Sequence, residues 1–417
     1  MRNTVSSLLA LVARKLRAAP LTLAVLAAGA QDASPGPSLR DAVDAAWQRA
    51  QEAAEAQGQA LRADASRSAA AGLLAAAPAI ELSHRDERLA DFGRGAARES
   101  EVAAALPLWR PALRAARVAA ADAETAQAQA AIASSRWQLA GRVRELAWRI
   151  VVARADLRQA QARHDALERL AADVDRRVGA GELARSDALA ARAEALGARA
   201  DAGEARLRLR EAEQAWAALI AMPPLAEERI EEAVPATASA SIEQHPQLQL
   251  AERQLEYAQR LRAAVAADRR DPPELLLSFR QEAGGADPRR NSVGVGVRIP
   301  LGNDVRNRPL EASAAGAVLL AERQLTATRA QVETALKLAG DARAAAQERL
   351  SADRERSALA RTRAGLIQRA FDAGEYGLPE LLRALAAASA ADADFERSQA
   401  ALRLARARLL QAQGLLP

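Results

Sequence analysis

The chain has no cysteine, and aromatic side chains make up only 3% of its 417 residues. The absence of cysteine excludes a disulfide framework, a thiolate metal site and a thiol nucleophile. Beyond position 30 no apolar run approaches the roughly 18 residues that a membrane-spanning helix needs. Any function in a membrane must therefore be carried out without transmembrane helices.

The segment 1–30 has the features of a secretory signal peptide. Four basic residues precede the short apolar run PLTLAVLAAGA, namely Arg2, Arg14, Lys15 and Arg17. The run ends in small residues that fit a cleavage site, so we predict that residues 1–30 direct export and are removed. Their loss takes the net charge from +5 to +1. This nearly neutral chain offers no basic surface for nucleic acid, and none is expected as a partner.

One pattern recurs at a constant offset along the sequence. Leu106-Pro107-Leu108 returns as Ile299-Pro300-Leu301, and the run GELARSDALAA that starts at Gly181 returns as GEYGLPELLRA at Gly374. A tandem duplication of a long unit is typical of a pseudo-symmetric architecture. We therefore expect each copy to supply an equivalent part of a larger assembly.

Each copy is predicted to contain an opening helical stretch, two short strands and a long helical hairpin. Period-two alternation predicts the strands, most clearly in SVGVGVRI, and the turn-rich segment EAGGADPRRN is expected to join the second pair. The copies are expected over 31–224 and 225–417, and their opening helices over Leu39–Leu74 and Ile242–Ala267. The strands are expected over about 79–85, 99–106, 274–281 and 292–299. The hairpins are expected over about 112–220 and 305–413.

A heptad seam runs along the first long helix, expected over Ala112–Arg177 and continuing to Val178. Its apolar positions alternate steps of three and four residues, and they are Val143, Leu146, Ile150, Ala153, Leu157, Ala160, Leu167, Ala171, Val174 and Val178. Such spacing is typical of helices that pack almost parallel to one another. Glycines near positions 181 and 374 are expected to end the long helices and form tight hairpin tips.

Four strands are too few for a closed outer-membrane barrel, for which eight is the usual minimum. An open sheet in lipid would leave the amides and carbonyls of its edges without partners. Two alternatives therefore remain. Strands from several chains share one barrel, or the strands form a small soluble layer on a helical bundle.

In combination these features resemble the TolC-type outer-membrane efflux proteins. The resemblance covers the whole chain after the predicted signal peptide, and it rests on the duplication, on the strand pair ending in Ile299-Pro300-Leu301, and on the tip pattern. That pattern comprises Gly181, Asp187, Leu189 and Ala191 in the first copy and Gly374, Glu380, Leu382 and Ala384 in the second. The segment IPLGNDVRNRP is most similar to outer-membrane components of heavy-metal (cobalt-zinc-cadmium type) resistance efflux systems.

The resemblance implies a mainly α fold with a small β part. Three chains would form a homotrimer whose 12-stranded outer-membrane β-barrel continues into a periplasmic α-helical barrel. The implied function is a passive exit duct of a tripartite efflux system, located in the outer membrane of a Gram-negative bacterium and in contact with its lipid. It would carry solutes, heavy-metal cations among the candidates, from a periplasmic adaptor (membrane fusion protein) and an inner-membrane efflux pump. The alternative is a periplasmic coiled-coil scaffold or adaptor without a pore, but two hairpins and no flanking β-rich domains favour the duct.

The resemblance also implies functional residues at the hairpin tips. Glu380 matches an acid at the periplasmic entrance, and Arg383 and Asp187 complete the expected gate, with Arg383 standing where the family often has a second acid. An arginine in place of this second acid suggests a Glu380–Arg383 arrangement between chains. For Glu380 and Asp187 the alternative is a carboxylate that stabilises a helix N-terminus, and for Asp187 this is the favoured one. The expected adaptor contacts are Arg177, Gly179, Gly181, Glu182, Arg369, Gly374 and Glu375, for which a plain helical turn is the alternative.

No constellation of catalytic residues is apparent in the sequence. The histidines are scattered, at His84, His164 and His245, whereas metal sites need clustered ligands. We therefore predict no enzymatic activity, no cofactor and no metal site. Trp109 and Phe279 are candidates for the lipid interface, and three further tryptophans are expected to pack between helices, namely Trp137, Trp148 and Trp216.

Overall fold

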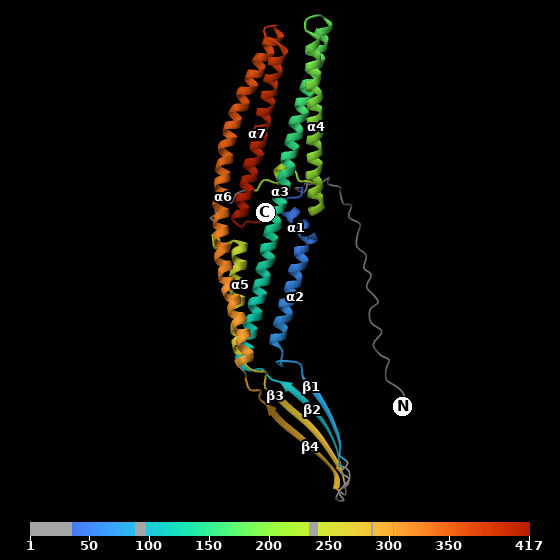
Figure 1. Cartoon of the computed structure of the whole chain (residues 1–417), viewed down its shortest axis with the longest axis vertical. Helices are drawn as coiled ribbons and strands as arrows, with labels where there is room; N and C mark the ends of the chain where they lie inside the picture. Colours follow the sequence, from blue (N-terminus) through green and yellow to red (C-terminus); the bar gives the residue numbers. More distant parts are fainter. Residues whose placement is uncertain (1–35, 88–96, 233–240, 285–286, 303) are drawn as a thin grey trace, which may run out of the picture. The chain divides into compact units, whose positions relative to one another are not determined.

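The computed structural model describes residues 36–87, 97–232, 241–284, 287–302 and 304–417. The predicted signal peptide, 1–30, and the DFGRG segment, 91–95, lie outside these residues. Apart from Gly36, the described residues belong to one unit, Pro37–Pro417. Its elements are α1 (Leu39–Arg49), α2 (Gln51–Ala71), β1 (Ala79–Glu87), β2 (Ala97–Pro107), α3 (Pro111–Gly179), α4 (Arg185–Ile220), η1 (Glu227–Arg229), η2 (Ile242–Gln244), α5 (Pro246–Ala267), β3 (Glu274–Gly284), β4 (Asp287–Arg298), α6 (Asp304–Asp372) and α7 (Leu378–Ala412) (Figure 1).

The offset of the sequence repeat recurs in the hairpins. Helices α3 and α6 each contain 69 residues. The offset that separates Gly181 from Gly374 also separates the starts and the ends of α3 and α6, and it separates the starts of α4 and α7. The two long helical hairpins are thus built from equivalent stretches of the two copies.

The four strands form one antiparallel sheet in the order β1-β2-β3-β4, as Figure 1 shows. All four predicted strands are present, and each is longer than expected. The segment 282–291, predicted to be a turn, lies largely in β3 and β4, where Glu282 pairs with both Glu99 and Arg290. Backbone pairing on both sides of β3 overrides the local preference of its turn-forming residues.

Both opening helices differ from their predicted bounds. The stretch Leu39–Leu74 is two helices, because Ala50 between α1 and α2 is extended, with φ −70° and ψ 136°. No proline or glycine marks this break, and α1 contacts both α3 and α4 whereas α2 packs on α3. The second helix begins at Pro246 and not at Ile242. The residue before a proline disfavours the helical region, and His245 is accordingly extended.

The long helices are arranged in rows, and each helix contacts the next helix of its row. In the hairpin region the row is α4–α3–α7–α6, and near the sheet it is α2–α3–α5–α6.

The seam predicted along α3 is confirmed, since each of its positions is buried or half-buried. Trp148 and Trp216 are fully buried in the core, as predicted. No helix among the described residues combines the length and the apolarity that a membrane span requires.

His245 is buried where α3 and α5 meet. Its Nδ1 atom accepts a hydrogen bond from the backbone N–H of Gln247 (3.3 Å), and its ring packs edge-on against Trp137 with centroids 4.7 Å apart. Burial lowers the pKa of His245 below its ordinary value, because the charged imidazolium loses hydration. The folded protein therefore favours the neutral ring.

We expect His245 to decrease the free energy of unfolding as the pH falls below about 6.5, the ordinary pKa of histidine. The unfolded chain binds a proton there that the folded chain does not, so the free energy of unfolding decreases as pH falls. His245→Asn, which keeps a capping acceptor, should flatten the decrease in Tm between about pH 6.5 and 5. His84→Asn, at an exposed strand position, should leave it unchanged. Equal slopes in wild type and His245→Asn would contradict this account.

Candidate membrane face and hairpin tips

One face of the sheet is apolar across all four strands. Alternate residues of a strand share a face, so the register places three rows together. These rows are Leu106–Leu275–Val297, Ile80–Ala104–Leu277–Val295 and Leu82–Val102–Phe279–Val293. The side chains are largely exposed, up to 80% for Val293 and 76% for Ile80. So large an apolar surface on a folded chain is typical of contact with lipid or with another protein.

The opposite face of the sheet is mainly polar, with one apolar row, Ala79–Ala105–Leu276–Gly296. It carries the rows Ser83–Glu101–Arg280–Ser292 and Arg85–Glu99–Glu282–Arg290. Arg280 bridges Glu99 and Glu282, and Arg298 pairs with Glu274 at 2.8 Å. A sheet with one apolar and one charged face has the alternation of a membrane barrel strand, whose two sides meet lipid and water.

The two aromatic residues expected near lipid differ in position. Phe279 lies on the apolar face of β3 and is partly exposed. Trp109 lies between β2 and α3, where its indole N–H donates to the carbonyl of Gly72 at 2.8 Å. Phe279 therefore belongs to the apolar face, whereas Trp109 joins the end of α2 to the start of α3.

Each hairpin turns at a glycine in the left-handed conformation. Gly181 has φ +83° and Gly374 has φ +78°. The N–H of Glu182 donates to the carbonyl of Arg177 (2.9 Å), and that of Glu375 to Ala370 (2.8 Å). Both ends therefore follow the Schellman pattern, and the glycines end α3 and α6 as predicted. The expected adaptor contacts other than Arg177 are exposed, namely Gly179, Gly181, Glu182, Arg369, Gly374 and Glu375.

The two tips are packed against each other. Six buried apolar side chains from both hairpins form one cluster, namely Ala171, Val174, Ala191, Phe371, Leu378 and Leu381. The Arg177 guanidinium covers this cluster, because it lies 5.2 Å from the centre of the Phe371 ring and pairs with Asp372 at 3.2 Å. Arg177 is thus a link between the hairpins within one chain, which its sequence position alone does not indicate.

Glu380 lies in the first turn of α7, where it pairs with two arginines of its own chain. Its carboxylate is 3.1 Å from Arg363 on α6 and 2.9 Å from Arg383. The Glu380–Arg383 pair suggested between chains therefore forms within one chain. Asp187 accepts a hydrogen bond from the N–H of Ala184 (3.3 Å) at the start of α4, which is the helix-stabilising role favoured for it. A gate role for these residues stays a prediction.

A buried ion pair between Arg144 and Glu232 links α3 to the segment that follows α4, and Arg144 also contacts α7. The Arg144 side chain is 2% exposed, and its Nε and Nη2 atoms donate to both carboxylate oxygens of Glu232, at 2.7 and 2.5 Å. Arg144 also donates to Gln411 and to the carbonyl of Leu415 (3.0 Å). These residues are distant in the sequence and follow no periodic pattern, so sequence reasoning missed them.

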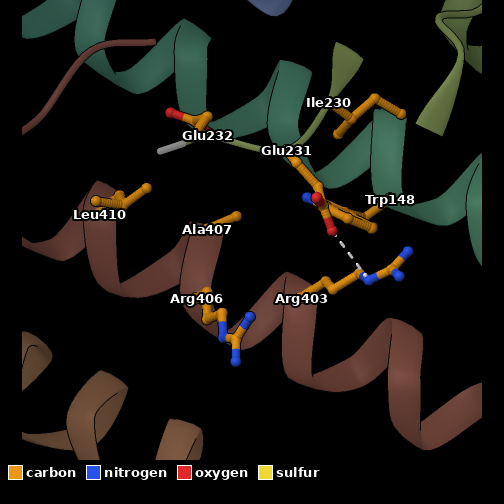
Figure 2. A pocket seen from close by; sticks show the side chains of 8 residues that line it. All are labelled: Trp148, Ile230, Glu231, Glu232, Arg403, Arg406, Ala407 and Leu410. Atoms are coloured by element: carbon orange, nitrogen blue, oxygen red, sulfur yellow. Dashed lines mark ion pairs between the residues drawn. The ribbon is translucent and has the colours of Figure 1, made fainter. Parts of the chain in front are cut away.

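A cavity of about 250 Å³ adjoins this ion pair, next to Trp148 (Figure 2). Arg403 of α7 reaches across it to Glu231 at 3.1 Å and also contacts Glu227. The lining is half charged and half apolar, and the Glu231–Arg403 pair joins the segment 227–232 to α7. We interpret this region as a structural connection within the helical layer.

No protein-family model and no curated protein matches the chain. Solved structures do match it over nearly its full length. The outer membrane protein VceC of Vibrio cholerae has a TM-score of 0.72 at 16% identity, covering 90% of this chain and 96% of VceC. The chain shares its fold with outer-membrane channels. The CmeC outer membrane channel of Campylobacter jejuni matches with a TM-score of 0.71 at 15% identity, covering 90% of this chain and 85% of CmeC.

The MtrE outer membrane channel of Neisseria gonorrhoeae, solved in an open state, has a TM-score of 0.65 at 17% identity and covers 91% of this chain and 89% of MtrE. The mainly helical fold with a small antiparallel sheet, which the resemblance implied, is thereby confirmed.

Proposed function

We propose that the protein is the outer-membrane exit duct of a tripartite efflux system. The observation that carries the proposal is the two-faced sheet, apolar on one side and charged on the other, with unpaired edges at β1 and β4 among the described strands. In lipid such edges need backbone partners. A duct made of several copies supplies them.

The sheet edges suit a ring of identical chains. Successive strands alternate in direction, so β1 and β4 run antiparallel to each other. Strand β4 of one copy can therefore pair antiparallel with β1 of the next, which preserves the pattern and leaves no edge. Three copies give twelve strands, within the range of bacterial outer-membrane barrels. This is the homotrimer that the family resemblance implies.

The helical rows favour the same head-to-tail closure. Helix α6 ends both rows on one side, while α4 and α2 end them on the other. Exposed leucines line these ends, with Leu189, Leu196 and Leu207 on α4 and Leu320, Leu338, Leu359 and Leu366 on α6. One rotation thus brings β4 and α6 of one copy onto β1, α2 and α4 of the next. Such heterologous contacts form a closed ring when the rotation closes.

The partners of the duct would be reached through the hairpin tips. Exposed residues at Gly181 and Gly374 are available to a periplasmic adaptor, which in turn would connect the duct to an inner-membrane efflux pump. The protein would pass solutes without consuming energy. The segment IPLGNDVRNRP supports heavy-metal cations as one class of exported solute.

Purification from the outer-membrane fraction, followed by light scattering and planar-bilayer recording, tests the proposal. We expect a particle of three chains that produces stepwise conductance. A monomer in the soluble periplasmic fraction that produces no conductance would contradict the duct and support a scaffold without a pore.

We expect the Glu380→Ala variant to need about ten times more divalent cation for half-maximal block of conductance. Three Glu380 carboxylates at the entrance would form a ring that binds cations. Arg383→Ala should shift block in the opposite direction, because it releases the carboxylate from its partner at 2.9 Å. Glu375→Ala, at an exposed position of the same tip, is the matched control. Unchanged block in Glu380→Ala would remove this residue from the gate.

A further inference from the structure

A groove between α2, α3 and α5 has the features of a binding site. It encloses about 390 Å³, within the range of pockets that hold drug-sized ligands. Its walls are mainly apolar, with Leu261, Val265 and several alanines, and Trp109 and Tyr257 contribute aromatic rings. It lies close to the sheet, because Trp109 directly follows the residues that leave β2.

The charges around the groove are paired, with one exception. Asp268 lies between Arg117 (2.7 Å) and Arg110 (3.2 Å). Arg117 also stacks over Trp109, 6.0 Å from the ring centre. Glu124, by contrast, has neither an ion pair nor a hydrogen bond within the described parts of the chain, although it is half-buried. Its carboxylate is therefore the one charged group of the groove that forms no ion pair among the described residues.

Tyr257 indicates that this charge acts on the groove. Its pKa is raised by burial and by the negative charge of Glu124, because both disfavour the phenolate. A carboxylate close to aromatic rings and apolar walls is suited to a ligand that has a positive charge on an apolar body, since the rings also attract cations. A ligand anion would meet the same repulsion as the phenolate.

We propose that this groove binds organic cations with an aromatic or alkyl body, with Glu124 as the counter-charge and Trp109 and Tyr257 as the contact surfaces. The groove is formed by α2, α3 and α5 of one chain, and in the proposed ring it would adjoin the contact that α2 makes with the next copy. The inference goes beyond the proposed duct, because a passive passage does not require a binding site in its wall.

Fluorescence titration of the detergent-purified full-length protein with two probes tests the site. Berberine is a planar permanent cation, and 8-anilinonaphthalene-1-sulfonate is an anion with an apolar body. We expect Glu124→Gln, which keeps the shape of the side chain, to weaken berberine binding about ten-fold, which corresponds to about 1.4 kcal/mol. Binding of the anionic probe should stay the same or become tighter.

Glu211→Gln is the matched control, because it makes the same substitution at an exposed position of α4 outside the groove. Both probes should bind this variant as they bind wild type. Unchanged berberine affinity in Glu124→Gln would overturn the proposal. An equal loss of both probes would also overturn it, since the residue would then support the groove and not its charge preference. Neither result depends on whether the protein conducts ions.

Discussion

The Val295→Arg variant is expected to fail to insert into the outer membrane. Val295 lies in the middle row of the apolar face, next to Leu277 of β3, and is 72% exposed. Arginine on the lipid side of a barrel costs about 2–4 kcal/mol near the bilayer mid-plane. In the proposed trimer each copy contributes this cost, so the total is comparable with the stability of a whole domain.

Sucrose-gradient fractionation of cells, with detection of the protein in each fraction, measures this effect. Ser292→Arg is the matched control, because Ser292 is exposed on the same strand and belongs to the polar face. We expect this control to reach the outer membrane and to conduct. Equal outer-membrane levels of the two variants would show that the apolar face does not contact lipid.

Replacing Arg144 by methionine is expected to lower the free energy of unfolding by about 3–5 kcal/mol. The Arg144 side chain is 2% exposed and that of Glu232 is 12% exposed. Methionine preserves much of the side-chain volume, but it leaves the Glu232 carboxylate buried without its partner. The carbonyl of Leu415 also loses a donor.

Denaturant unfolding followed by circular dichroism measures the loss. Arg158→Met, at an exposed position of the same helix, should change the free energy of unfolding by less than about 0.5 kcal/mol. The double variant Arg144→Met with Glu232→Met should recover most of the loss, because no unpaired charge then remains. A loss below about 1 kcal/mol in Arg144→Met would contradict a stabilising role of the pair.

Features with a local or periodic cause were predictable from the sequence. The seam from Val143 to Val178 follows from helical spacing, and the hairpin tips follow from glycines that adopt φ of +83° and +78°. Alternation predicted the strand in SVGVGVRI, and the repeat placed the strands of the first copy at equivalent positions. The constant offset between the copies anticipated the equal lengths of α3 and α6, because a duplicated pattern of apolar residues encodes the same element twice.

Features that depend on distant neighbours were not predictable in this way. The break at Ala50 has no local signal. Strand β3 extends through Glu282 because β2 and β4 pair with it from both sides. Arg144 and Glu232 are 88 residues apart, and nothing in either segment specifies the other.

The sequence by itself determined the strands and the two long hairpins, because helix periodicity, strand alternation and glycine conformation act over a few residues. Only the tertiary structure decided which side chains meet. It paired Glu380 with Arg363 and Arg383 inside one chain and left the Glu124 carboxylate without an ion pair among the described residues. The physical reason is that a charge depends on every group within a few ångströms, and the packing of α3 against α2, α5 and α7 determines those groups.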